Sequence, residues 1–215
     1  MVECKFPEYL LDYLGDNNTF QCEDFMSEII FVIKAFPISF NKSDLYTKEF
    51  IDNKSNFVIK SISDSFFLSN DFRKNYTIYF LSELEGNSYL IVFKGDELRF
   101  LGPSYFSAAH LLLRVKNNIL YPNSKEGKLT PGISIHKHTI KWISRNYKES
   151  KWFKIGTSME LSENIKDVLS PTSNIFLFGF DNTPDIDIEI TDVSFGPLEI
   201  DEQIIMTNYM IESVI

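Results

Sequence analysis

Short apolar runs of strand length alternate with amphipathic stretches over residues 29–215, and this alternation limits the possible folds more than any other feature of the sequence. The clearest runs are 29–36, which Pro37 follows, and 174–178, which ends at Gly179. A continuous apolar run of this length is typical of a strand that is buried on both faces of a sheet. Strands that alternate with helices favour a parallel arrangement. We therefore predict an α/β fold with a mainly parallel sheet and helices on both of its faces.

Other segments fit the same pattern. The helical spacing of apolar residues predicts helices over residues 55–68, 104–116, 162–169 and 201–214. Runs rich in β-branched and aromatic residues predict further strands over residues 76–81, 88–93, 151–155, 186–190 and 193–195. The polar residues 83–87 favour a hairpin between the first two of these strands, and a parallel arrangement stays open.

Length and cysteine content bound the class of protein. With 215 residues, the chain is long enough to bury a core without a disulfide or a structural metal. We predict one domain over 29–215, preceded by an N-terminal extension over 1–28 that carries seven acidic residues against one lysine. No apolar run has membrane-spanning length, and the first residues lack the apolar region of a signal peptide. We therefore expect no membrane partner. Cys4 and Cys22 form no CxxC motif, so we expect two reduced thiols and a cytoplasmic location.

The charge is distributed unevenly along the chain. The net charge of −9 disfavours a nucleic-acid partner, but residues 111–155 carry ten basic side chains against two acidic ones. Residues 156–215 carry one lysine against twelve acids. A basic block of this kind can mark a surface that faces phosphates, with Lys137, Lys141 and Arg145 as candidate RNA contacts. Equally, it can be a solvated face that balances the acidic segment within the molecule or across a dimer.

Several familiar motifs are absent from the sequence. It contains no GxGxxG, no P-loop and no GxSxG nucleophile elbow. His136 and His138 have the spacing of half a metal site, but Lys137 and Lys141 lie beside them. The positive charges of these lysines would repel a metal cation, so we expect no metal and interpret the two histidines as structural or phosphate-facing. The acids of residues 181–192 lack the central glycine of a calcium loop.

Three stretches are left over by these arguments, namely 61–74, 129–133 and 193–200. In the last of them, a Gly-Pro pair fixes a tight loop before the final helix. Open α/β sheets bind ligands in such loops at the carboxyl ends of their strands. In this order, and together with 31–35, the stretches resemble the TrmY family of SPOUT-superfamily methyltransferases. That family methylates N1 of pseudouridine in the T-loop of archaeal tRNA. The resemblance runs from Phe31 to the C-terminus.

The resemblance implies a fold, a cofactor and a set of site residues. The fold would contain a deep C-terminal trefoil knot, an exception to the rule that chains are unknotted. The protein would be a homodimer that binds S-adenosylmethionine in the knot loops and RNA, with tRNA favoured, as its substrate. The cofactor-binding residues would be Ile155, Gly156, Gly179, Val193, Ser194, Phe195, Gly196, Pro197, Leu198 and Ile205. The catalytic residues would be Asp64, which accepts or orients the N1 proton, and Arg73, which holds a phosphate.

The sequence departs from the family pattern at some of these positions. Residues 179–184 replace a loop that usually contains Gly-Asp-His. Ile205 stands where the family has a cysteine, and Asp201 stands where it has a histidine. Two further hypotheses therefore stay open. The chain can be a catalytically silent knotted homodimer that binds RNA or a protein, or an enzyme related to the ribosomal pseudouridine methyltransferases of the same superfamily.

Overall fold

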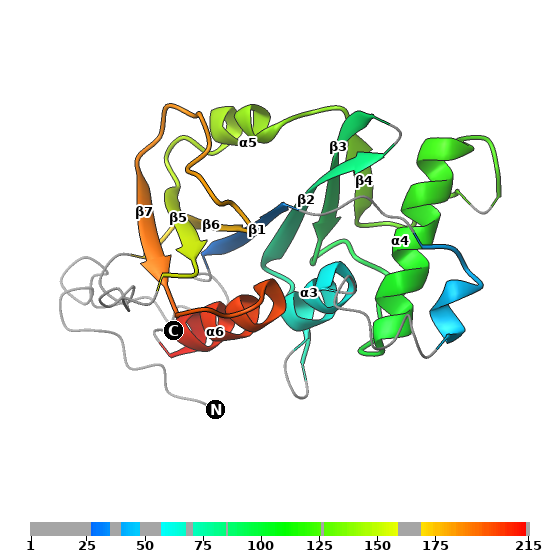
Figure 1. Ribbon diagram of the computed structural model, residues 1–215, viewed down its shortest axis with the longest axis horizontal. Helices are drawn as coiled ribbons and strands as arrows, with labels where there is room; N and C mark the ends of the chain where they lie inside the picture. The colour runs from blue at the N-terminus through cyan, green and yellow to red at the C-terminus, as the bar shows by residue number, and fades with distance from the viewer. Residues whose placement is uncertain are drawn as a thin grey trace, which may run out of the picture.

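In the described part of the chain, seven strands form one sheet that runs through the centre of the molecule (Figure 1). The computed structural model describes residues 27–34, 40–47, 57–67, 71–84, 86–125, 127–158 and 169–213. The elements follow one another as β1 (Glu28–Lys34), η2 (Asp44–Tyr46), α3 (Phe57–Phe66), β2 (Tyr76–Leu84), β3 (Asn87–Lys94), α4 (Tyr105–Leu120), β4 (Ile133–His136), α5 (Ile140–Asn146), β5 (Lys151–Gly156), β6 (Ser173–Phe178), β7 (Ile190–Ser194) and α6 (Ile200–Glu212).

The strand order is β4-β3-β2-β1-β6-β5-β7. At the centre, β1 pairs in parallel with β2 and with β6. On one side, β5 pairs in parallel with β6 and β7. On the other side, β2, β3 and β4 form antiparallel pairs. The prediction of a mainly parallel α/β sheet is confirmed, and the segment 83–87 does form the predicted hairpin.

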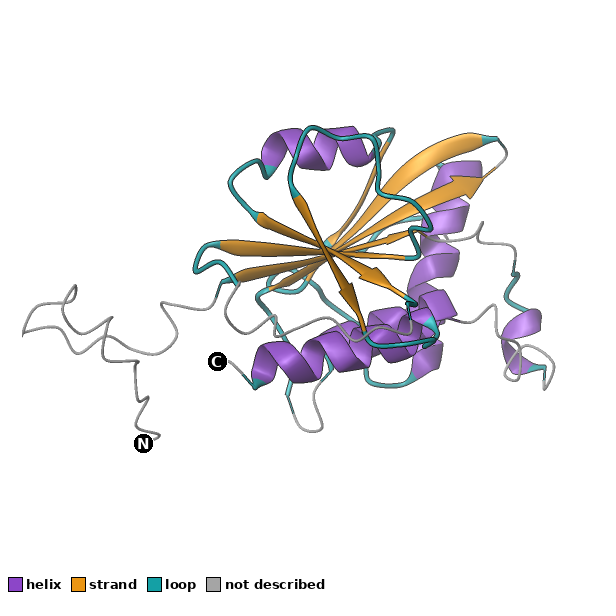
Figure 2. Cartoon of the chain, turned by 60° about the vertical axis from the view of Figure 1, so that its left-hand side comes forward, coloured by secondary structure: helices purple, strands orange, loops and turns teal. Residues whose placement is uncertain are grey.

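Both faces of the sheet are covered, as Figure 2 shows. Side chains of successive strand residues point to opposite faces, so neighbours in β1 contribute to different cores. On the first face, Phe31 and Phe176 pack with residues from α3, α4 and α6. On the second face, Val32 and Trp152 pack with Ile143 of α5. The predicted helices on both faces are therefore present.

The predicted strand over residues 186–190 is wrong. In the structure, β7 begins only at Ile190, and residues 181–189, all of them described, pair with no strand. Ile186 and Ile188 pack against the core of the second face, whereas the acids that alternate with them, Asp185, Asp187 and Glu189, are exposed. The two-residue period of apolar residues over 186–190 therefore reflects a segment that lies on the sheet with one side buried. It does not indicate backbone hydrogen bonds to a neighbouring strand.

Some elements were missed and others lie outside the described residues. Neither β4 nor α5 is predicted, because four and seven residues are too few for a clear hydrophobic period. The predicted helix over 162–169 falls largely on residues that are not described, and so does the predicted N-terminal extension over 1–28. The same holds for part of the connection from β5 to β6, so the trefoil knot stays a prediction. Among the described residues, no helix combines the length and apolar character needed to cross a membrane.

The turn over 130–133 has a structural reason for its glycine. Gly132 has a φ of +80°, and a Cβ atom placed on it would lie 2.4 Å from the Cα atom of Leu98. Its carbonyl also accepts a hydrogen bond from the backbone N–H of Lys94, with an N–O distance of 2.9 Å. Both the backbone conformation and the close approach of another backbone segment exclude a side chain here.

We therefore expect Gly132→Ala to lower the free energy of unfolding by roughly 2–4 kcal/mol, because it adds backbone strain to a steric clash. Chemical denaturation of the purified variant measures this. Gly102→Ala is the matched control, since a Cβ atom there makes only ordinary contacts with Ser107. Equal stability of the two variants would contradict the argument.

Candidate functional site

A cavity of about 700 Å³ opens where the parallel strands β5, β6 and β7 end. The first turn of α6 closes one side of it. We call this cavity the carboxyl-edge cleft. Six of the ten residues that the sequence analysis assigns to a cofactor line it, namely Ile155, Gly156, Gly179, Val193, Ser194 and Leu198. Residues from three separate loops are thus brought together, because parallel strands present their carboxyl ends at the same edge of a sheet.

The other four assigned residues are not part of the lining. Phe195, Gly196 and Pro197 belong to the loop between β7 and α6, and Phe195 packs against the core of the first face. Ile205 is 52% exposed on α6. Its neighbour Ile204 is buried, and adjacent helical residues point about 100° apart, so Ile205 faces away from the sheet.

Ser194, the last residue of β7, holds the loops of the cleft together. Its hydroxyl oxygen lies 2.6 Å from the carbonyl oxygen of Ser158 and 3.2 Å from that of Gly156. The same oxygen accepts a hydrogen bond from the backbone N–H of Gly196, with an N–O distance of 3.3 Å. One short side chain therefore connects the loop after β5 to the loop before α6.

Gln203, which the sequence analysis did not select, gives the cleft a buried acceptor. It is 2% exposed, and its Nε2 donates to the carbonyl of Leu198 at 2.9 Å. Its Oε1 is buried and has no hydrogen-bond partner among the described residues. A buried polar atom without a partner costs about 1–3 kcal/mol, so this oxygen is suited to a ligand N–H or O–H. The sequence signal was an amide on the buried stripe of α6, next to Ile204.

A second cavity of about 780 Å³ adjoins the cleft. The two cavities share Gly179, Phe180, Asp181 and Ile200 as lining residues. We call it the adjoining pocket. Tyr89, His138 and Phe180 contribute aromatic surface to it, and Ser82, Ser88, Asn182 and Thr183 contribute polar groups. A ligand in the carboxyl-edge cleft would therefore adjoin a second cavity with an aromatic and polar lining.

Arg73 lies away from both cavities and connects two helices. Its Nη1 donates to the carbonyl oxygens of residues 64, 65 and 67, at the end of α3, over 3.0–3.2 Å. Its Nε donates to the carboxylate of Glu212, in the last turn of α6, at 3.0 Å, and Nη2 forms an ion pair with the same oxygen. A buried guanidinium that satisfies a helix C-terminus in this way stabilises the packing of α3 on α6. Its phosphate contact stays a prediction.

Asp64 belongs to the last turn of α3, close to α6, and its side chain is half-buried. The pKa of its carboxyl is raised to about 6, mainly by burial and to a lesser degree by the nearby Asp201, whereas Lys60 and Arg73 act in the opposite direction. Lys60 forms an ion pair with Asp201 at 3.1 Å. Asp201 belongs to the same first turn of α6 that lines the carboxyl-edge cleft. Asp64 is therefore next to that turn but does not line the cleft.

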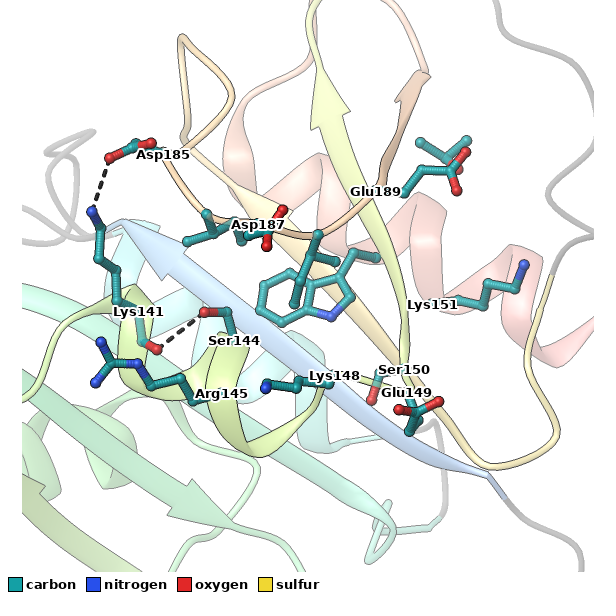
Figure 3. Close-up of a pocket in the computed structure, with 14 residues that line it drawn as sticks. Lys141, Ser144, Arg145, Lys148, Glu149, Ser150, Lys151, Asp185, Asp187 and Glu189 are labelled. Carbon is teal, nitrogen blue, oxygen red and sulfur yellow. Dashed lines mark hydrogen bonds and ion pairs between the residues drawn. The ribbon is translucent and has the colours of Figure 1, made fainter.

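The basic residues lie on another side of the molecule. A cavity of about 870 Å³, which we call the charged groove, separates α5 from residues 185–189 (Figure 3). Its lining contains four cations, namely Lys141, Arg145, Lys148 and Lys151. It also contains four acids, namely Glu149, Asp185, Asp187 and Glu189.

One ion pair spans the charged groove. The Nζ of Lys141 lies 2.8 Å from the carboxylate of Asp185, and the lysine lowers the pKa of that carboxyl. Both side chains are exposed, and so are Lys137 and Arg145. The basic block therefore balances part of the acidic segment here and still presents cations to solvent. Among the described residues, no group of three or more His, Cys, Asp or Glu side chains is placed to hold a metal ion.

Together, these features define an α/β protein whose ligand cleft lies at the carboxyl ends of a mainly parallel sheet. The fold is similar to that of Archaeoglobus fulgidus Nep1 bound to S-adenosylhomocysteine, with a TM-score of 0.54 and 11% sequence identity. The match covers 88% of this chain and 99% of that chain. At this identity, the match shows a shared fold. No protein-family profile matches the sequence, and neither does any curated protein.

The environment of Asp64 predicts how stability depends on pH. Because the pKa of this carboxyl is about 6 in the folded chain against an ordinary value of 3.8, its ionisation favours unfolding as the pH rises from about 4 through 6. We expect Asp64→Asn to raise the melting temperature above about pH 7 and to leave it unchanged near pH 4. Thermal unfolding at a series of pH values measures this. Asp96→Asn, at an exposed position, is the control, and a pH-independent difference for Asp64→Asn would refute the assignment.

Proposed function

We propose that the protein is an S-adenosylmethionine-dependent RNA methyltransferase of the SPOUT class, with the cofactor in the carboxyl-edge cleft. One observation carries the proposal. Six residues assigned to the cofactor from sequence come together in one cleft, in a fold shared with a protein whose structure holds S-adenosylhomocysteine. The size of the cleft, about 700 Å³, is within the range of small-molecule sites.

The residues of the cleft fit this cofactor. Ile155, Val193 and Leu198 offer apolar surface to an adenine ring, and the Oε1 of Gln203 offers an acceptor to its amino group. Gly156 leaves space on the cleft side, because a Cβ atom there would meet only the carbonyl oxygen of Val193, at 3.7 Å. When bound, the cofactor supplies a methyl group on a positively charged sulfur.

Charged residues at the cleft complete the fit. Lys154 and Asp192 form an ion pair at 2.9 Å, with the lysine mostly buried. Lys154 is positioned to attract the carboxylate of the methionine part, and Asp192 and Asp181 to attract cationic groups. Because Lys154 neutralises Asp192, the acidic character of this rim is weaker than the sequence implies.

The finer parts of the proposal rest on the sequence resemblance. They are the trefoil knot, one methyltransferase domain over 29–215 and methylation of N1 of pseudouridine in the tRNA T-loop. Asp64 would accept the N1 proton, a role that a carboxyl with a pKa of about 6 is able to perform near neutral pH. A homodimer is supported by an apolar strip on α6 that is exposed in the single chain, formed by Ile205, Met206 and Tyr209.

A second candidate function is a catalytically silent RNA-binding module with the same fold. The observation that favours it is the placement of Asp64 and Arg73, neither of which lines the carboxyl-edge cleft. The guanidinium of Arg73 is engaged by Glu212 and by the end of α3. Cofactor binding separates the two candidates, since only the methyltransferase needs it.

Isothermal titration calorimetry with S-adenosylmethionine and S-adenosylhomocysteine tests the cofactor. We expect binding by the unmodified chain and at least a tenfold loss for Gly156→Val, because the added side chain would enter the cleft. Gly102→Val is the control outside the cleft and retains binding. A folded protein that shows no heat of binding at millimolar cofactor would refute the methyltransferase and favour the silent module.

The RNA contacts are tested by the salt dependence of binding. Each phosphate neutralised on single-stranded RNA contributes about 0.7 to the slope of log K against log salt. Replacing Lys137, Lys141 and Arg145 by glutamine should therefore reduce the slope by roughly 2. The matched control carries the same charge change at exposed positions outside the basic block, namely Lys42→Gln, Lys74→Gln and Arg99→Gln. Equal slopes for the two triple variants would show that the basic block does not contact phosphates.

A further inference from the structure

Three aromatic rings lie parallel to one another next to α5. His136 ends β4, His138 lies in the connection to α5, and Trp142 lies in the first turn of α5. The ring plane of His138 makes an angle of 7° with the ring plane of His136 and also with that of Trp142. The ring planes of His136 and Trp142 make an angle of 12° with each other. The ring centroids of His136 and His138 are 5.6 Å apart, those of His138 and Trp142 are 5.0 Å apart, and those of His136 and Trp142 are 6.3 Å apart. The three centroids therefore form a triangle and not a column. Parallel rings in this arrangement form a stepped aromatic surface, which we call the aromatic platform.

The aromatic platform is accessible to solvent, and two of its three side chains make no hydrogen bond to other described residues. All three residues are half-buried, so each keeps part of its surface in solvent. Trp142 is anchored from below by the core of the second face. His136 bonds to the hydroxyl of Ser134 at 3.0 Å, whereas the side chain of His138 and the indole N–H of Trp142 have no hydrogen-bond partner among the described residues.

The surroundings of the platform connect it to both features of the proposed function. His138 lines the adjoining pocket, which shares Gly179 and Asp181 with the carboxyl-edge cleft. On the other side, Lys141 and Arg145 flank Trp142 on α5 and line the charged groove, as Figure 3 shows for the two cations. The platform therefore lies between a basic surface and the space next to the cleft.

Aromatic surface beside exposed cations is the combination that binds unstacked nucleotides. Bases of single-stranded RNA stack on aromatic rings while cations contact the phosphates between them. In a duplex, the base faces are covered by their neighbours and are not available. Lys141 can leave its exposed ion pair with Asp185 and contact a phosphate at little cost, because such surface pairs contribute only about 0–1 kcal/mol to stability.

We propose that the aromatic platform stacks a base of single-stranded RNA and directs the next nucleotide into the adjoining pocket, beside the carboxyl-edge cleft. The choice of RNA as the partner rests on the proposed function. The platform determines the preference for single strands, and Lys141 and Arg145 contribute affinity that does not depend on base exposure.

The test measures the affinity of the full chain for fluorescently labelled RNA by anisotropy, with a single-stranded oligouridylate and a duplex of equal length. We expect tighter binding of the single strand. His138→Ala should weaken this binding roughly 5- to 150-fold, the loss of one stacked base, without changing the salt slope. His138→Phe should retain binding, because it keeps a flat ring. His110→Ala, on α4, is the matched control and should bind like the unmodified chain.

A second readout uses the two tryptophans of the chain. In a Trp152→Phe variant, the single strand should change the fluorescence of Trp142, and the duplex should not. If His138→Ala binds the single strand as tightly as the unmodified chain, or if both RNAs bind equally well, the platform is not a stacking site. Calorimetry with the cofactor is independent of this result. A platform that fails while cofactor binding persists leaves the methyltransferase intact, and the converse result leaves a single-strand RNA-binding protein.

Discussion

The burial of β1 is the constraint on which the rest of the structure depends. Residues Ile29 to Ile33 are completely inaccessible to solvent, so strands must flank β1 on both edges and helices or loops must cover both of its faces. Parallel partners on both edges, β2 and β6, satisfy the backbone groups of β1 and require that the connecting chain cross over the sheet. Because parallel strands end at the same edge, this pairing also creates the edge at which the carboxyl-edge cleft opens.

Helix α6 carries both structural and functional contacts. Its inner side packs on α3, where the carbonyl of Asp64 accepts hydrogen bonds from Arg73 and from Asn208. Its first turn provides Gln203 to the cleft and Asp201 to the surroundings of Asp64. Ser194 fixes the loop that leads into this turn. Changes in the packing of α6 on α3 are therefore transmitted directly to the residues that line the cleft.

The second face of the sheet is arranged differently, because short elements cover it. Ile186 and Ile188 hold an irregular acidic segment against the core, and α5 lies beside it. Between them lies the charged groove, and the aromatic platform lies at the beginning of α5. The same segment begins at Gly179, so its first residues line the cleft and its later residues line the groove. A substrate that contacts both sites would follow this segment and α5.

Long apolar runs are enough to predict β1 and β6 from the sequence, and a long helical period of apolar residues is enough to predict α3 and α4. Because loops that follow parallel strands meet at one edge of a sheet, the sequence pattern also predicts that the ends of β5, β6 and β7 lie together. Which groups face each side chain depends on how these elements pack, and this is visible in the tertiary structure alone. It showed that residues 186–189 lie on the sheet without pairing, since a period of two reports one-sided burial and not a hydrogen-bonded partner. It showed that Arg73 binds Glu212, 139 residues away, and that the three rings of the platform are parallel. Contacts of this kind depend on how elements pack, and local periodicity carries no information about that.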